Sequence, residues 1–155
     1  MRKVSYFILA FILLSLTACH MVPETLQPPR TVTINIKADD NINPNNSGQP
    51  QPLYIMLFEL KNASAFKRVS FFNLYQKPDA TLGADMLSLQ KVYIKPGDEF
   101  AIKYEVTRNA KYLGIIAAYT NIDAAQWRTV VTLDSSWGNE PIWLDVHELE
   151  VDGKN

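Results

Sequence analysis

Apolar and polar residues alternate along several parts of the chain in the pattern of β-strands. From Thr31 to Ala38 (TVTINIKA) the even-numbered residues are apolar and the odd-numbered ones polar, which predicts a strand with one buried face. Pro52 to Leu60 (PLYIMLFEL) and Tyr112 to Thr120 (YLGIIAAYT) are apolar at both parities and predict strands that need cover on both faces. Four further strands are predicted over residues 85–94, 99–106, 127–133 and 141–151.

One helical insert interrupts the strands. Asn62 to Gln76 (NASAFKRVSFFNLYQ) carries aromatic and aliphatic residues at helical spacing, and such a stripe favours core packing over a binding site. The strand over residues 112–120 contains residues small enough to let a second layer approach closely. They are Gly114, Ala117 and Ala118.

The connections between strands are short and rich in turn residues. Lys95 to Asp98 (KPGD) predicts a turn that joins its two flanking strands in a hairpin or close to one. In the last strand the apolar parity changes near His147 and Glu148, which predicts a bulge. Seven strands with one helical excursion favour an all-β fold, a two-layer antiparallel β-sandwich in one domain.

The connection between the first two strands is the exception. It has thirteen mostly polar residues, whereas connections in compact domains usually have about four to six. Its asparagines tolerate a left-handed backbone, its prolines reduce the entropy of the free loop, and Ile42 is its lone apolar anchor. We predict a partly ordered protrusion that is the working surface of the protein. The candidate partner-binding residues are Asp39, Asp40, Asn41, Ile42, Asn43, Pro44, Asn45, Asn46, Ser47, Gly48, Gln49, Pro50 and Gln51.

The first eighteen residues have the features of a cleaved signal peptide. Arg2 and Lys3 precede an uncharged apolar run that is shorter than the about twenty residues a permanent membrane helix needs. The next residues, LTAC from Leu16 to Cys19, resemble a bacterial lipobox, whose cysteine becomes the lipidated N-terminus. Cys19 is the only cysteine in the chain. The alternative is that Cys19 is an ordinary buried cysteine.

These features divide the chain into three parts. We expect residues 1–18 to be removed before Cys19, residues 19–30 to form a lipidated flexible tether, and residues 31–155 to form the β-sandwich domain. The tether contains three prolines and no apolar period. Two or more acyl chains on Cys19 hold a protein firmly to a membrane. His20 follows the cysteine in place of the aspartate that retains enterobacterial lipoproteins in the inner membrane, so the outer membrane is expected.

The remaining residues offer little chemistry for catalysis. Without Arg2 and Lys3 the chain has 13 Lys and Arg against 16 Asp and Glu, a formal charge of −3 that does not suggest nucleic acid as a partner. Asp145 and His147 share a strand face, but further ligands at zinc-like spacing are absent. No nucleophile elbow, P-loop or dinucleotide fingerprint occurs. We predict a protein that is not an enzyme and has no cofactor apart from the lipid on Cys19, and no small-molecule substrate.

A different class of function rests on the tryptophans. Trp143 falls on the outward parity of the last strand, and Trp137 lies in the turn before it. Exposed aromatic rings stack on sugar faces, so the alternative is a periplasm-facing lipoprotein that binds carbohydrate or peptidoglycan.

Several stretches in order resemble a known family, the outer-membrane lipoprotein of type VI secretion systems (TssJ, also called SciN). Besides the lipobox, the matching stretches are NNSGQPQPLYIMLFEL (45–60), AFKRVSFFNLY (65–75), LGADML (82–87), KPGDE (95–99) and YLGIIAAYTNIDAAQWR (112–128). The chain departs from the usual family pattern at Met56, Phe58, Glu59 and Thr120.

The resemblance implies a transthyretin-like β-sandwich, lipid-anchored in the outer membrane and facing the periplasm. It also implies a non-catalytic role: binding the periplasmic C-terminal part of the inner-membrane protein TssM and thereby anchoring the envelope-spanning complex. The long loop from Asp39 to Gln51 is our candidate for that contact.

Overall fold

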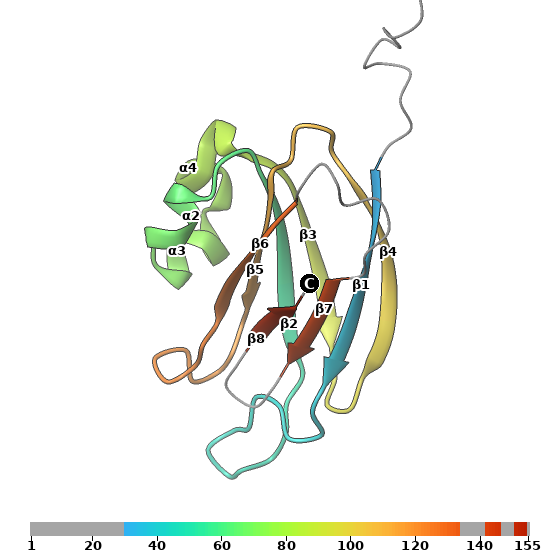
Figure 1. The fold of residues 1–155 in the computed structure, drawn as a ribbon. Coiled ribbons are helices and arrows are strands. Elements are labelled where there is room, and N and C mark those ends of the chain that lie inside the picture. Colours follow the sequence, from blue (N-terminus) through green and yellow to red (C-terminus); the bar gives the residue numbers. More distant parts are fainter. Residues whose placement is uncertain (1–29, 134–141, 147–150, 155) are drawn as a thin grey trace, which may run out of the picture.

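The computed structural model describes residues 30–133, 142–146 and 151–154, the last two segments as backbone only. Two β-sheets lie face to face, and short helices cover the outer face of one of them (Figure 1). The elements are β1 Arg30–Ala38, β2 Leu53–Leu60, α2 Ser64–Arg68, α3 Phe71–Gln76, α4 Pro78–Leu82, the 3-10 turn η2 Gly83–Asp85, β3 Met86–Ile94, β4 Glu99–Val106, β5 Tyr112–Ala117, β6 Arg128–Thr132, β7 Ile142–Val146 and β8 Val151–Lys154.

The strand order is β4-β1-β7-β8 in one sheet and β3-β2-β5-β6 in the other. All pairs are antiparallel except β1 and β7, which run parallel with Ile34 opposite Ile142. The two-layer β-sandwich predicted from the alternation is therefore confirmed. The single strand predicted over residues 141–151 is instead two strands, β7 and β8, paired antiparallel. The predicted bulge falls on His147 and Glu148, which lie outside the described residues.

The predicted hairpin across residues 95–98 is wrong. β3 pairs with β2 and β4 pairs with β1, so the turn carries the chain from one sheet to the other. The turn itself has the expected chemistry: the backbone N–H of Lys95 donates to the carboxylate of Asp98 at 2.7 Å, and Gly97 has φ of 75°. Turn residues reverse the chain locally, but the sheet each strand joins depends on where its apolar face finds cover.

The core has two parts, one between the sheets and one under the helices. Val32, Ile34 and Ile36 of β1 are buried between the sheets, as their alternation predicts. β2 is apolar at both parities because its other face, with Met56 and Phe58, packs against the helical insert. The cover predicted for this strand is therefore present.

The helical insert is three short helices and a 3-10 turn where one helix was expected. Ser70 interrupts the helical spacing, and its hydroxyl caps α3 by accepting from the N–H of Asn73 at 3.4 Å. Pro78 begins α4, where its missing N–H costs no hydrogen bond. The described residues contain no helix of a length and hydropathy suited to crossing a membrane.

The insert sits close to β5 because Gly114 has no side chain. A Cβ at Gly114 would lie 2.7 Å from the ring of Phe66, so the close approach predicted there is confirmed. Arg128 of β6 also holds α2 against the sheet, because its guanidinium donates to the carbonyls of Phe66 and Val69, each at 2.8 Å. Burial lowers the pKa of this guanidinium from its ordinary value.

Candidate functional site

The long loop lies at one end of the sandwich, at the bottom of Figure 1. β1 ends there and β2 begins, and the connections over residues 95–98 and 118–127 reach the same end. We call these three connections the loop end. β1 begins at Arg30 at the opposite end, beside the connection between β4 and β5. We call Arg30 with residues 107–111 the basic end, because it carries Arg30, Arg108 and Lys111.

The tip of the loop is an ordered turn centred on Asn45. The side-chain oxygen of Asn45 accepts from the backbone N–H groups of Ser47 at 2.9 Å and Gln49 at 3.0 Å. Backbone bonds close the same turn, with the N–H of Asn45 donating to the carbonyl of Gln49 at 2.9 Å. Gly48 takes a φ of 75°, which a side chain would disfavour. The loop is thus a structured protrusion, as its asparagine and proline content predicts.

The base of the loop is fixed in the domain. Ile42 has 0% of its surface exposed and belongs to the core between the sheets. Asn43 is also buried, with a φ of 50°; its amide donates to the carbonyl of Pro52 at 3.1 Å, and its oxygen accepts from the N–H of Thr120 at 2.7 Å. The expectation that Ile42 offers an exposed apolar anchor is therefore wrong, because Ile42 attaches the loop to its own core.

The loop still presents a broad polar surface. Pro44, Asn45 and Gln51 are half-buried, and the remaining eight candidate residues are exposed. These exposed residues are Asp39, Asp40, Asn41, Asn46, Ser47, Gly48, Gln49 and Pro50. A partner that contacts this loop meets amide, carboxylate and backbone groups, and the rigid turn presents them in one arrangement.

The turn over residues 95–98 braces the loop from the side. The N–H of Gly97 donates to the carbonyl of Asp39 at 3.2 Å, and the N–H of Ala38 donates to the carbonyl of Asp98 at 2.8 Å. Glycine at position 97 is favoured by its φ of 75°; a Cβ there would lie 2.6 Å from a carboxylate oxygen of Asp40, whose exposed side chain would have to shift. The loop end is one hydrogen-bonded unit.

An exposed aromatic pair extends this surface onto the outer face of the second sheet. Tyr54, at the start of β2, and Tyr93, near the end of β3, are opposite each other in the register, with ring centroids 5.2 Å apart. Their exposed fractions are 45% and 47%. We did not predict this pair, although the parity of Tyr93 between buried Val92 and Ile94 is a signal that could have placed it outside.

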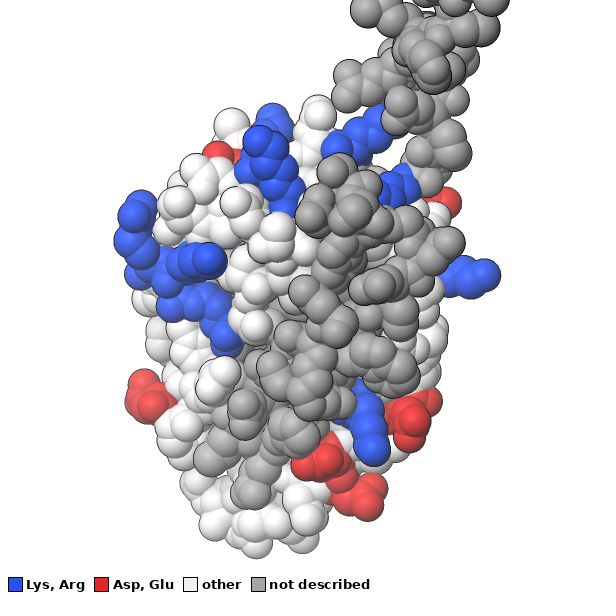
Figure 2. Space-filling model, in the orientation of Figure 1, with Lys and Arg blue, Asp and Glu red and all other residues white. Residues whose placement is uncertain are grey.

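Charge differs between the two ends. Figure 2 shows Asp and Glu mainly toward the lower, loop end and Lys and Arg mainly over the upper half. Exposed acids of the loop end include Asp39, Asp40 and Asp123, with Glu99 directly after the turn. The described residues contain no group of three or more His, Cys, Asp or Glu able to hold a metal ion. Cys19, Trp137 and His147 lie outside the described residues, and Trp143 in β7 is described as backbone only.

Comparisons with known proteins identify the family. The model of the type VI secretion lipoprotein family, described with the names VasD, EvfM and TssJ, matches residues 30–152. The crystal structure of the T6SS lipoprotein TssJ1 from Pseudomonas aeruginosa is 32% identical, with a TM-score of 0.72 over 83% of this chain and 98% of that chain. A comparison with curated proteins finds no match.

Two further solved structures share the fold. A chain of a type VI membrane complex has a TM-score of 0.74 at 22% identity, covering 83% of this chain and 100% of that chain. A chain of the structure described as the T6SS protein TssM C-terminal domain from EAEC has a TM-score of 0.70 at 20% identity, covering 81% and 98%. The family match and the TssJ1 identity are decisive: the chain belongs to the type VI secretion lipoprotein family.

Proposed function

We propose that this lipoprotein anchors the type VI secretion membrane complex to the outer membrane. In this proposal acyl chains on Cys19 hold the protein in the membrane, and the loop from Asp39 to Gln51 binds the periplasmic C-terminal part of TssM. The protein contributes binding and no catalysis. The likeness to chains from a type VI membrane complex and from a TssM structure supports an assembly role of this kind.

One observation carries the assignment of the loop: its tip is already ordered in the isolated chain. The turn closed by Asn45 holds Ser47 and Gln49 in place without a partner. A preordered loop loses little conformational entropy on binding, so more of its contact energy appears as affinity. A tip that served only to connect β1 and β2 would need neither the length nor these bonds.

The position of the loop fits a protein held at its other end. Arg30 lies eleven residues after Cys19, a span of at most about 40 Å when fully extended. From Arg30, the nine residues of β1 rise by roughly 30 Å before the loop begins. A chain anchored by Cys19 can therefore present its loop end away from the lipid, toward the periplasm.

The test targets the exposed tip and leaves the buried base intact. Asn46→Arg with Gln49→Arg adds two large charged side chains, while the backbone bonds to Asn45 remain. We expect the affinity for the periplasmic C-terminal part of TssM to fall by more than about tenfold, because bulk and charge at the centre of a contact exclude the partner. Calorimetry with the two purified proteins measures this affinity, and the melting temperature reports the fold.

The matched control makes the same two changes elsewhere. Asn109→Arg with Gln90→Arg alters exposed residues at the basic end and on β3, with the same gain in charge. This control should bind TssM as the unchanged protein does. Normal binding by the tip variant, or equal loss in both variants, would rule out the loop as the contact.

The anchor is tested separately with Cys19→Ser. We expect this variant to lose its lipid by mass spectrometry, to leave the membrane fraction and to fail in secretion, while it still binds TssM in solution. Secretion that persists with the soluble variant would contradict an anchoring role.

A further inference from the structure

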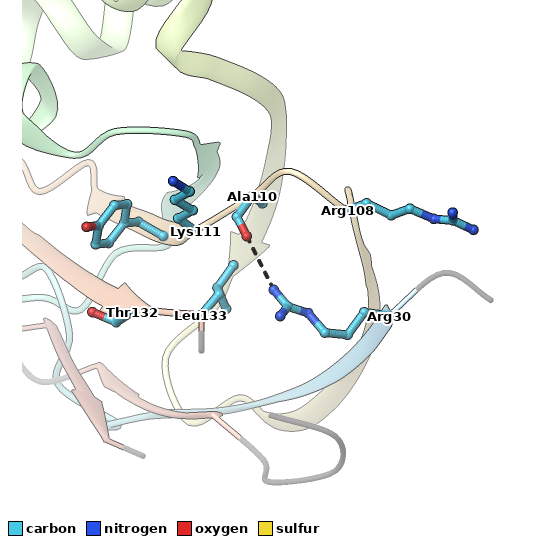
Figure 3. A pocket seen from close by; sticks show the side chains of 7 residues that line it. Arg30, Arg108, Ala110, Lys111, Thr132 and Leu133 are labelled. Atoms are coloured by element: carbon cyan, nitrogen blue, oxygen red, sulfur yellow. Dashed lines mark hydrogen bonds between the residues drawn. The ribbon is translucent and has the colours of Figure 1, made fainter. Parts of the chain in front are cut away.

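The basic end contains a cavity that the proposed partner contact does not use. It has a volume of about 350 Å³, and three cations line it: Arg30, Arg108 and Lys111 (Figure 3). The rest of its lining includes Ala110, Thr132 and Leu133. In Figure 3 the side chain of Arg30 reaches across toward Ala110, and Arg108 extends outward from the rim.

Backbone bonds hold the rim of this cavity. The N–H of Ala110 closes a turn onto the carbonyl of Thr107 at 2.9 Å, and the guanidinium of Arg30 donates to the carbonyl of Ala110 at 3.4 Å. Lys111 is fixed on both sides, because its N–H donates to the carbonyl of Leu60 at 2.9 Å and its carbonyl accepts from Leu133 at 2.8 Å. The backbone of Lys111 and the side chain of Arg30 are therefore held in place, and Arg108 extends from the same short connection.

The cavity favours anions. Among the residues described as lining it there is no carboxylate. The acid nearest to Arg30 along β4 is Glu105, which is exposed, whereas its neighbours Tyr104 and Val106 point into the core. Glu105 thus faces away from the cavity. Guanidinium and ammonium groups around a hollow of this size suit phosphate oxygens, which accept several charge-assisted hydrogen bonds.

The place of the cavity indicates the source of the phosphate. Arg30 lines the cavity and lies eleven residues after Cys19, so the predicted tether begins beside it. If Cys19 carries the lipid, the basic end is the part of the domain closest in sequence to the bilayer. Cations beside a lipid anchor bind anionic headgroups, and the two signals together anchor better than either alone.

We propose that the basic end docks on the phosphates of anionic phospholipids in the membrane that holds Cys19. The choice of membrane rests on the proposed lipid anchor, but the affinity for phosphate groups does not. Docking turns the loop end away from the bilayer and limits the rotation of the domain on its tether. The loop is then offered in a narrow range of orientations to a partner that comes from the other side.

The test uses residues 19–155 with Cys19→Ser, so that no acyl chain contributes and failure of the lipid anchor cannot affect the result. This chain keeps every residue that the structure describes. Sedimentation with phosphatidylcholine vesicles enriched in phosphatidylglycerol should show binding at low salt, and pure phosphatidylcholine vesicles should show little. Adding Arg108→Gln with Lys111→Gln should weaken the binding by about 30-fold, from the typical contribution of each cation at an anionic surface.

Lys37→Gln with Lys95→Gln is the matched control, because it removes two exposed cations, one near the end of β1 and one in the turn of the loop end. It should keep binding within about twofold. Equal loss in both double variants would overturn the proposal in favour of a general charge effect. Absence of binding to the anionic vesicles would also overturn it. Inorganic phosphate should displace the protein from the vesicles more than chloride of equal ionic strength does, since it competes with the headgroups for the cavity; equal displacement by the two salts would overturn the cavity as the phosphate site.

Discussion

The two ends of the sandwich are closed in different ways. At the loop end, buried Asn43 uses both its amide and its oxygen, bonding Pro52 and Thr120. Nearer the basic end, buried Glu59 accepts from the N–H of Thr107 at 2.9 Å, but the hydroxyl of Tyr104 has no hydrogen-bond partner within the part of the chain that the structure describes. The buried polar groups of the loop end are therefore better satisfied by hydrogen bonds than those near the basic end. Such satisfaction favours a single conformation.

The outer surfaces differ in the same sense. The loop end projects a long, ordered and mainly polar protrusion whose charged residues are acidic, whereas the basic end has short connections with cations around a cavity. A rigid protrusion suits recognition of one protein surface, while cations on flexible side chains suit headgroups that have no fixed arrangement. Under the two proposals, one small domain separates a specific protein contact from a general lipid contact by placing them at opposite ends of its strands.

The largest loss of stability at the loop end is expected from a change at Ile42, the residue that attaches the loop to the core. Ile42→Ala removes a wholly buried side chain between the sheets and should lower the free energy of unfolding by about 3 kcal/mol. The loop would lose its rigidity, so binding to TssM should weaken even where the domain stays folded. Denaturant unfolding and calorimetry measure the two effects.

Asn46→Ala is the control for Ile42→Ala. It changes an exposed side chain four residues away and should alter the unfolding free energy by less than about 0.5 kcal/mol. A stability loss for Ile42→Ala as small as that of Asn46→Ala would mean that the base of the loop is not held by the core.

The sequence predicts the strands well because alternation is a local signal. The one-sided pattern of β1 and the two-sided patterns of β2 and β5 follow directly from which faces are covered. Ile42 shows the limit: a single apolar residue among asparagines and prolines has no period, so nothing in the pattern marks it as buried. The segment 95–98 shows another, because a turn signal does not tell which sheet each strand joins.

The candidate site could be predicted from the sequence only where a single segment of the chain forms it. The loop stands out because its thirteen residues are contiguous and too many for a simple connection. The basic end combines Arg30 with Arg108 and Lys111, which the chain separates by almost eighty residues. Only the antiparallel register of β1 with β4, which sets Arg30 opposite Val106, brings them together. A sequence pattern contains no such register.

Substitutions of Asn43 should cause a smaller loss of stability, and they separate the contribution of its hydrogen bonds from that of its backbone conformation. Asn43→Ala leaves the N–H of Thr120 and the carbonyl of Pro52 without their partner. It also places alanine, which tolerates a left-handed backbone less well than asparagine, at a φ of 50°. We expect a loss of about 2 kcal/mol, measured by denaturant unfolding.

Asn43→Gly removes the same hydrogen bonds but accepts the positive φ. It should therefore lose less stability than Asn43→Ala, by up to about 1 kcal/mol. Equal losses in the two variants would mean that the left-handed backbone costs nothing here and that Asn43 is needed for its bonds alone.

The smallest change in stability at neutral pH is expected at Tyr104, because its hydroxyl makes no hydrogen bond to any described residue. Desolvation by burial raises the pKa of Tyr104 to about 12 from its ordinary value of 10.0, although nearby Ser88 acts in the opposite sense and Glu59 adds to the rise. Tyr104→Phe removes a buried hydroxyl that has no hydrogen-bond partner among the described residues, so it should leave stability within about 1 kcal/mol of the unchanged protein at neutral pH.

Alkaline pH should reveal the difference between Tyr104 and its phenylalanine variant. Because the folded pKa lies above the unfolded one, the neutral phenol favours the folded state fully below about pH 10, and this contribution is lost as pH rises toward about 12. Unfolding free energies measured across that interval should fall more steeply for the unchanged protein than for Tyr104→Phe, in which every other titrating group is retained. Parallel pH profiles would show that Tyr104 ionises in the folded protein as easily as in the unfolded chain. The interior near the basic end would then be wet enough to satisfy the hydroxyl of Tyr104, and the two ends would differ less in hydrogen-bond satisfaction than the contacts of Asn43 and Glu59 imply.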